Sequence, residues 1–424
     1  MTAKNILWSL AALCLGSAYA MAQDIPFTSD MQKADALVRA GRYWDTNALL
    51  TAATFAPDGS VKDKMLFQYW SQFTPFVTNE VDPIVYDRAG RFGAPDPSWA
   101  TRIAAAEPRD AIAEIVARAK TTRIVILNEA HYSPRDRAFA WQVARALRPL
   151  GYDVLAAEAF GNNPESPGGP TPAERLAQDR IVRRSLGMYT LDPVFANYVR
   201  GALALGYRPI GYEQTAAQQT PEGGVPEREQ AQAENVMAFL RAHPTARLLI
   251  HVGHGHVLEG GAKKPEYAMM AQRLKQMSGI DPLTIDQTRL SELASNARPA
   301  LQVAAPRLHG KPVVFFEGDR PMILGSAEDS VDLQIVHPPR RYVKGRPDWP
   351  ANLGGRPRAI PRDLLPQRGA RLIQVFAADA SDDTVPLDQV LVEAGKPVPV
   401  LMVPNVPIRF VTQGNGAMVA GSSK

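Results

Sequence analysis

Short apolar runs alternate with amphipathic stretches through the middle of the chain. The runs cover residues 123–127, 153–157, 208–212, 247–252 and 283–285. Continuous apolar runs of this length are typical of strands that are buried on both faces, and the stretches between them have helical spacing. Strands that alternate with helices fold into a mostly parallel sheet flanked by helices. The pattern therefore predicts an α/β domain over residues 105–300.

Each predicted strand leads into a carboxylate or a histidine. In chain order these residues are Glu129 and His131, Glu158, Glu213, His254 and His256, and Asp286. Ligands of parallel sheets bind beyond the carboxyl ends of the strands. We therefore expect the acids and imidazoles to meet at one edge of the sheet.

The regions on either side have different patterns. Residues 23–104 are expected to form a helical extension, and residues 109–120 a further helix. Residues 301–369 form a connecting segment whose end is rich in proline and arginine, a composition that fits an extended linker or a strip that docks on an acidic surface. Short apolar runs predict a small all-β module over residues 370–424; they cover 372–376, 389–392, 398–403 and 408–411.

The first 22 residues have the pattern of a secretory signal peptide, with one lysine, an apolar run over 6–15 and small residues near Ala20. The apolar run is shorter than the roughly 20 residues of a spanning helix, so we expect a periplasmic or secreted protein without an integral membrane span. The lone cysteine, Cys14, lies in this leader, which leaves the mature chain no thiol chemistry. A formal net charge of +4 is too small to indicate nucleic-acid binding.

The strand ends carry residues that suit either catalysis or metal binding. Glu129, His131, His254 and His256 are candidate ligands for a divalent Zn, Mn, Fe or Co ion. For His251 and His254, a hydrogen-bonding role at a turn fits equally well. Arg228 is a candidate for binding an anionic substrate group, with Glu213 supporting the site, although both residues also suit structural contacts. The other histidines, His243, His309 and His337, lie in loops or beside a proline, as surface residues do.

These residues resemble the superfamily of ChaN-like haem-binding proteins, Tiki proteases and erythromycin esterases over residues of about 105–290. The matching motifs are Asn128-Glu129-Ala130-His131, Glu158, Arg228 with Asn235, and Gly253-His254-Gly255-His256. Asn128 replaces the first glycine of the family motif, which changes the turn. The resemblance implies a metal-dependent peptidase, an ester hydrolase or a haem binder.

Two functions are therefore expected. The first is an exported hydrolase in which Glu129, His131, Glu158 and His256 activate water against an ester or amide of a small molecule or peptide. No Gly-x-Ser-x-Gly motif is present, which favours activated water over a serine nucleophile. The alternative is a non-catalytic protein that binds haem or a metallophore.

Overall fold

The computed structural model describes residues 28–88, 90, 93–221, 223–262, 264–414 and 417–420. The expected signal peptide, residues 1–22, lies outside the described residues. Within them, no helix is both long enough and apolar enough to span a bilayer.

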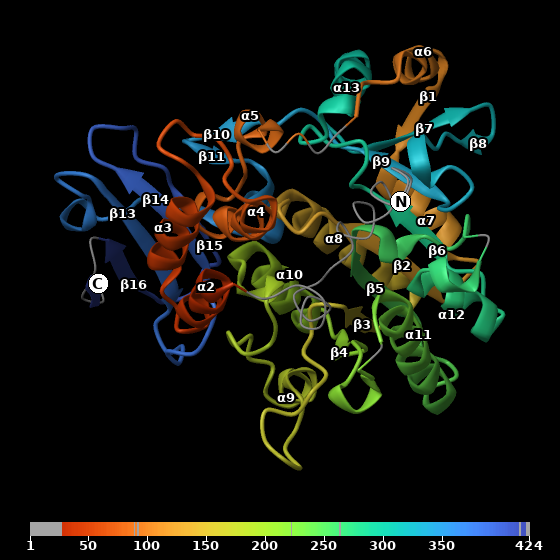
Figure 1. The fold of residues 1–424 in the computed structure, drawn as a ribbon, viewed down its shortest axis with the longest axis horizontal. Helices are drawn as coiled ribbons and strands as arrows, with labels where there is room; N and C mark the ends of the chain where they lie inside the picture. The colour runs from red at the N-terminus through yellow and green to blue at the C-terminus, as the bar shows by residue number, and fades with distance from the viewer. Residues whose placement is uncertain are drawn as a thin grey trace, which may run out of the picture.

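A nine-stranded mixed sheet occupies the centre of the described chain, in the order β1-β7-β9-β6-β2-β5-β3-β4, with β8 paired to β7 (Figure 1). The six strands from β9 to β4 in this order are parallel, and β1, β7 and β8 pair in antiparallel fashion. The strands are β1 Glu107–Asp110, β2 Ile124–Glu129, β3 Val154–Ala157, β4 Arg208–Ile210, β5 Leu248–Gly253, β6 Leu283–Asp286, β7 Val313–Glu317, β8 Arg320–Pro321 and β9 Leu333–Val336.

Helices cover both faces of the sheet, and the apolar runs of the strands explain why. In β2, Val125 and Leu127 enter one hydrophobic core, whereas Ile124 and Ile126 enter another on the opposite face. The first core is completed by α7 Ala111–Ala119, α8 Pro134–Leu147 and α10 Pro193–Ala204, and the second by α11 Val225–Ala242 and α12 Met270–Ser278. The remaining helices of this part are α9 Pro172–Asp179 and α13 Arg298–Ala304.

The fold class is confirmed, but the sheet extends beyond the expected boundaries. The expected end of the α/β domain at residue 300 falls before β7 and β9, which join the sheet through buried apolar residues. Residues 109 and 110, expected to start a helix, instead end the edge strand β1, because residues 107–110 pair with β7. Tertiary pairing here outweighs the local helical pattern.

A helical N-terminal region and a C-terminal β module pack together beside the sheet (Figure 1). The amide of Gln413 donates to the carbonyl of Gly41 over 2.6 Å, and Asn79 donates to Gln389 over 3.3 Å. The helices of the N-terminal region are α2 Ser29–Arg39, α3 Tyr43–Thr54, α4 Lys64–Thr78 and α5 Pro83–Asp87. The next helix, α6 Pro97–Ala105, packs instead on α13 near β1, away from the β module (Figure 1). The module has a four-stranded antiparallel sheet of β13 Ala370–Ala377, β14 Asp388–Glu393, β16 Ile408–Gly414 and β17 Ala417–Ala420, and two strand pairs formed by β10 Tyr342–Val343 with β11 Arg346–Pro347 and by β12 Arg356–Arg358 with β15 Leu401–Val403.

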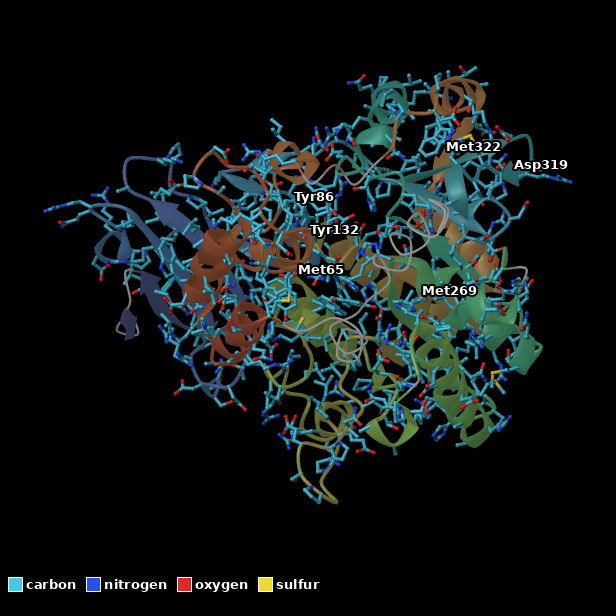
Figure 2. All side chains as sticks on the ribbon, viewed as in Figure 1. Met65, Tyr86, Tyr132, Met269, Asp319 and Met322 are labelled. Atoms are coloured by element: carbon cyan, nitrogen blue, oxygen red, sulfur yellow. The ribbon has the colours of Figure 1, made fainter. Side chains whose placement is uncertain are left out.

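The outer regions contact the central domain and the Pro- and Arg-rich segment that follows it. Tyr86 of α5 packs on Tyr132, just beyond β2, with ring centroids 4.6 Å apart (Figure 2). The Pro- and Arg-rich segment docks on acidic residues and is not a free linker. Arg346 is buried against Asp388 at 2.7 Å, and Arg340 pairs with Glu80 at 2.8 Å. The arginines of this segment thus form ion pairs with carboxylates of the neighbouring regions.

Candidate functional site

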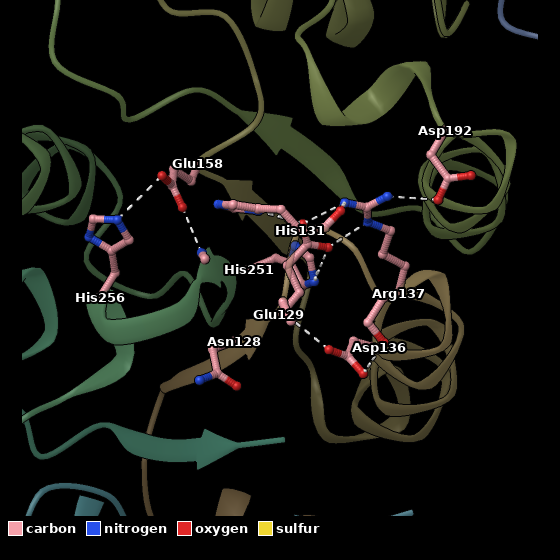
Figure 3. Close-up of polar contacts among 12 residues, drawn as sticks. Asn128, Glu129, His131, Asp136, Arg137, Glu158, Asp192, His251 and His256 are labelled. Atoms are coloured by element: carbon pink, nitrogen blue, oxygen red, sulfur yellow. Dashed lines mark hydrogen bonds and ion pairs between the residues drawn. The ribbon is translucent and has the colours of Figure 1, made fainter. Parts of the chain in front are cut away.

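The predicted site residues meet at the carboxyl ends of four neighbouring strands. β2, β5, β3 and β4 are adjacent in that order, and Glu129, His256, Glu158 and Glu213 stand at or just beyond their ends. Parallel pairing sets Glu129 of β2 opposite Gly253 of β5. Figure 3 shows Glu129, His131, Glu158 and His256 gathered at this edge. The structure thus brings the expected residues together in two connected clusters.

The first cluster is built around Glu129 and the fully buried Arg137 of α8. Arg137 donates from Nε and Nη2 to the two carboxylate oxygens of Glu129, over 2.6 and 2.8 Å, and from Nη1 to Asp192 over 2.8 Å. Burial would raise the pKa of Glu129, but the charge and hydrogen bonds of Arg137 outweigh it and lower that pKa. Glu129 is therefore an ionised residue with both oxygens engaged.

The imidazole of His131 is held in a fixed orientation by this cluster. Its Nδ1 lies 3.0 Å from Oε1 of Glu129, and its ring stacks on Tyr189 with centroids 3.8 Å apart and planes inclined by 9°. Because Glu129 is an ionised acceptor, the proton of neutral His131 belongs on Nδ1. This tautomer leaves Nε2 as an acceptor on the opposite side of the ring.

Gly253 makes room for His131 beside Glu158. A Cβ atom on Gly253 would lie 2.4 Å from Cε1 and 2.6 Å from Nε2 of His131, and 3.0 Å from Oε2 of Glu158. Any side chain at this position would therefore collide with the imidazole. The glycine lets Nε2 of His131 and the Glu158 carboxylate approach the same small space at the end of β5.

The second cluster surrounds Glu158 with donors. Arg228 of α11 donates to Oε1 of Glu158 over 2.6 Å, and the backbone N–H of Gly253 donates to Oε2 over 2.6 Å. Nε2 of His256 lies 3.4 Å from the same Oε1. Burial opposes ionisation of Glu158, but His256 and Arg228 lower its pKa well below the usual value. Glu158 is ionised and, unlike Glu129, lines an open cleft.

His256 is a buried cation between two carboxylates. Its Nδ1 lies 2.6 Å from Oε1 of Glu229, and its Nε2 faces Glu158. Burial opposes the positive charge, but Glu229 and Glu158 outweigh it and raise the pKa of His256 to about 10. Nη1 of Arg228 also lies 3.2 Å from Nε2. Because both nitrogens face buried protein partners, His256 is suited to holding Glu158 in place and not to accepting a proton from a substrate.

Arg228 and Glu213 bond to each other and to neighbouring residues of the protein. Arg228 is buried and donates to both oxygens of Glu213 as well as to Glu158. Gln232 donates to Glu213 over 3.1 Å. Arg228 therefore serves as the bridge that fixes two carboxylates, because its guanidinium is already occupied. This differs from the expectation that Arg228 binds an anionic substrate group.

The four residues expected to bind a metal do not form a ligand set. Arg137 occupies both oxygens of Glu129, and both nitrogens of His256 face carboxylates. His254 occupies the turn after β5 with a φ of 31°. Among the described residues, no group of three or more His, Cys, Asp or Glu side chains is arranged to hold a metal ion. The donor geometry accordingly does not fit the expected metal site.

Asp286 lies at the same edge of the sheet but outside both clusters. It is fully buried, and it accepts hydrogen bonds from Asn128 over 2.8 Å and from Arg289 over 3.0 Å. Asn128 also donates to the backbone carbonyl of His254 over 2.8 Å. Asn128 thus fixes the turn that carries His254 and leads into His256.

Two further histidines are buried and structural. His251 lies 3.7 Å from Glu129, and burial lowers its pKa to about 4, so it is neutral. His337, expected at the surface, is buried and its Nε2 lies 2.9 Å from Oε1 of Gln287. The expectation for His337 was wrong because the end of β9 is covered by α8, where Phe139 packs edge-on against its ring.

A cleft of about 460 Å³ opens beside Glu158. Its wall includes Glu213, the loop after β3 and residues 184–189. Tyr189 lines the cleft and is 4% exposed, and its hydroxyl has no hydrogen-bond partner among the described residues. A buried hydroxyl without a partner needs an explanation, and a ligand in the neighbouring cleft would supply the missing partner.

Sequence analysis missed Tyr189, Arg137 and Asp192. Arg137 has a usable signal, since it stands on the first turn of the helix that follows the Glu129 motif. Tyr189 begins a short 3-10 helix, and Asp192 is the N-cap of α10. Only the fold places them beside His131 and Arg137.

No protein-family model and no curated protein matches the chain. Solved structures of bacterial toxins are distantly similar to it. One described as bacterial protein toxins has 16% identity and a TM-score of 0.31, over 57% of this chain and 55% of that one. The RRSP effector domain of a MARTX toxin from Vibrio vulnificus CMCP6 has 15% identity and a TM-score of 0.28, over 54% and 50%. A third, also described as bacterial protein toxins, has 15% identity and a TM-score of 0.32, over 57% and 55%. The chain therefore spans about half the length of these structures.

Proposed function

We propose that the protein is an exported hydrolase in which His131 activates water against an ester or amide carbonyl, and that this step needs no metal ion. The observation that carries the proposal is the chain from Arg137 through Glu129 to Nδ1 of His131. It holds the imidazole in the tautomer whose Nε2 can accept a proton. An oriented imidazole of this kind is a suitable general base.

In the proposed step, Nε2 of His131 takes a proton from water while the water oxygen attacks the carbonyl carbon. The Glu158 carboxylate lies on the same side of His131, where it positions the water and stabilises the imidazolium that forms. His131 then returns the proton to the departing alcohol or amine. Neither carboxylate changes its protonation state, since Arg137 holds Glu129 ionised and His256 together with Arg228 holds Glu158 ionised.

Tyr189 is proposed to donate to the carbonyl oxygen as negative charge develops there. Burial, followed by the nearby Glu158 carboxylate, raises the pKa of Tyr189 well above its usual value. Its hydroxyl therefore keeps the proton that it would donate. The absence of an internal partner for this hydroxyl among the described residues supports a role toward the substrate.

We also propose that the chain belongs to the superfamily of ChaN-like proteins, Tiki proteases and erythromycin esterases. This proposal is supported by the meeting of its motif residues, Glu129, His131, Glu158 and His256, at one edge of the sheet. Export rests on the leader-like residues 1–22. Binding of haem or a metallophore, or use of a divalent metal, stays a prediction that the following experiment tests.

The test is turnover of a panel of ester and peptide substrates by the purified mature protein, with metal analysis and absorption spectra before and after addition of haem. We expect turnover that survives chelation and falls by about 100- to 10,000-fold in His131→Ala. His243→Ala is the matched control and should keep full turnover, because His243 lies at the C-terminal end of α11, whereas Arg228 of the site lies near its N-terminal end. Stoichiometric haem binding with no turnover would instead establish the binder, and full activity of folded His131→Ala would remove the assigned base.

A further inference from the structure

Arg184 lies in the wall of the cleft beside Glu158. It has no carboxylate partner within the described part of the chain. The other charged side chains of its wall have ion-pair partners. Arg39 pairs with Asp35, Glu165 with Arg175, Asp383 with Arg183, and both Glu158 and Glu213 with Arg228. For Arg184, no ion pair occurs among the described residues. Arg184 is therefore the cation of this wall that has no carboxylate partner among the described residues.

Backbone carbonyls hold the guanidinium of Arg184. Its Nε donates to the carbonyl of Arg39 over 2.8 Å, and its Nη1 donates to those of Asp382 and Thr384 over 2.6 and 3.0 Å. Carbonyl dipoles fix the position of the cation without neutralising it. No hydrogen bond from Nη2 to another described residue accompanies them. Arg184 is thus a preorganised cation with donor capacity remaining.

The C-terminal β module supplies two of these three carbonyls. Residues 382–384 lie in the loop between β13 and β14, where Thr384 forms a bridge with Arg183 and the N–H of Arg184 donates to the carbonyl of Asp383 over 2.8 Å. The third carbonyl comes from the end of α2 in the N-terminal region. Both outer regions therefore build the wall of the cleft that faces the central domain.

We infer that the cleft selects substrates with an anionic group, which pairs with Arg184 while the reacting carbonyl lies at His131, Glu158 and Tyr189. This inference rests on the proposed function and names its substrate class. The volume of about 460 Å³ suits a small molecule or a short peptide segment, since ligand sites commonly have about 300–1,000 Å³. The C-terminal module then has a role, because its carbonyls position Arg184, which pairs with the anionic group of the substrate.

The experiment compares two esters of equal acyl length, the mono-4-nitrophenyl ester of glutaric acid and 4-nitrophenyl valerate. We expect the wild-type protein to prefer the acidic ester by about 10- to 100-fold in kcat/KM, the range for a hydrogen bond to a charged group. Arg184→Gln should lose this preference, with the acidic ester affected far more than the neutral one. Arg148→Gln is the matched control, because Arg148 is likewise half-buried and bonded to a backbone carbonyl, that of Leu205, but lies outside the cleft wall.

A binding measurement separates failure of this inference from failure of the proposed function. Titration calorimetry with glutarate should show binding to the wild-type protein that weakens by at least about 10-fold in Arg184→Gln and not in Arg148→Gln. Arg184-dependent glutarate binding without turnover of either ester would keep the anion site and contradict the ester hydrolase. Turnover without preference for the acidic ester, or equal losses on both esters in Arg184→Gln, would overturn the anion site and leave the hydrolase. Absence of both turnover and glutarate binding would overturn both.

Discussion

Glu129 and Glu158 are the same residue type at the ends of nearby strands, and both are buried, ionised and bonded to a buried arginine. Their surroundings differ in one respect. Both oxygens of Glu129 accept from Arg137, and Glu129 lies behind His131, whereas Glu158 accepts from Arg228 and from the backbone N–H of Gly253 and lines the cleft. Access to the cleft, and not charge, therefore separates the carboxylate proposed to orient the base from the carboxylate proposed to meet the substrate.

The largest expected effect comes from removing the arginine of the enclosed cluster. Arg137→Met would leave Glu129 and Asp192 buried without their cation, so the free energy of unfolding should fall by about 3–5 kcal/mol. Denaturant unfolding measures this change. Arg102→Met, which removes a half-exposed pair with Glu317, should cost at most about 1 kcal/mol. Equal losses in the two variants would show that the buried cluster contributes no more than a surface pair.

The next effect tests the close approach of His131 to Gly253 and Glu158. Gly253→Ala would place a methyl group against the imidazole of His131, so kcat/KM should fall by about 100-fold, as expected for a displaced catalytic group. Gly279→Ala, at an open position with no neighbour near its Cβ, controls for loss of a glycine and should affect stability alone. Unchanged kcat/KM in Gly253→Ala would mean that His131 does not need its present position.

Two buried histidines should give opposite pH dependences of stability. The pKa of His256 is about 10 in the folded chain against 6.5 ordinarily, so its contribution is complete below 6.5 and lost as pH rises through about 10. The pKa of His251 is lowered to about 4, so its contribution is complete above 6.5 and lost as pH falls through about 4. Each limb has a slope of at most about 1.4 kcal/mol per pH unit.

Urea unfolding across pH measures both limbs. His256→Gln should flatten the alkaline limb relative to the wild-type chain, and His251→Gln the acid limb. If His256→Gln left the alkaline limb unchanged, the cation between Glu158 and Glu229 would be disproved.

The smallest effect concerns the wall of the cleft. Tyr189→Phe should lower kcat/KM by about 10-fold, the loss expected for one hydrogen bond of about 1.4 kcal/mol in the transition state. The free energy of unfolding should not fall, because the hydroxyl has no internal partner within the described chain. Tyr198→Phe is a matched control, since its hydroxyl is also buried and unpartnered among the described residues but does not line the cleft. Equal kcat/KM for Tyr189→Phe and the wild-type protein would remove the proposed donor.

The sequence predicts the central sheet and its functional edge well because apolar runs and the residues that end them are local signals. The apolar run 124–127 predicts a strand, and the end of that strand places Glu129 at the edge of the sheet. The sequence predicts poorly what depends on distant partners. Residues 107–110 become a strand only through β7, and the arginines near residue 340 dock because Glu80, Glu292 and Asp388 come from elsewhere in the chain.

The roles of the site residues show the same division. That Glu129, His131, Glu158 and His256 meet follows from parallel strands, but which of them can accept a proton depends on partners that no motif encodes. Arg137 and Glu229 decide that Glu129 orients and that His256 stays a cation. Arg228 is expected from the sequence to bind a substrate anion, but its guanidinium donates to Glu213 and Glu158 within the protein.

The most direct measurement of the central claim is a double-mutant cycle in kcat/KM between Glu129→Gln and His131→Ala on the best ester substrate. If Glu129 acts only by orienting His131, each single variant loses activity and the double variant loses no more than His131→Ala alone. If the two losses instead multiply, Glu129 acts independently of His131, and the account of one orienting and one substrate-facing carboxylate is contradicted.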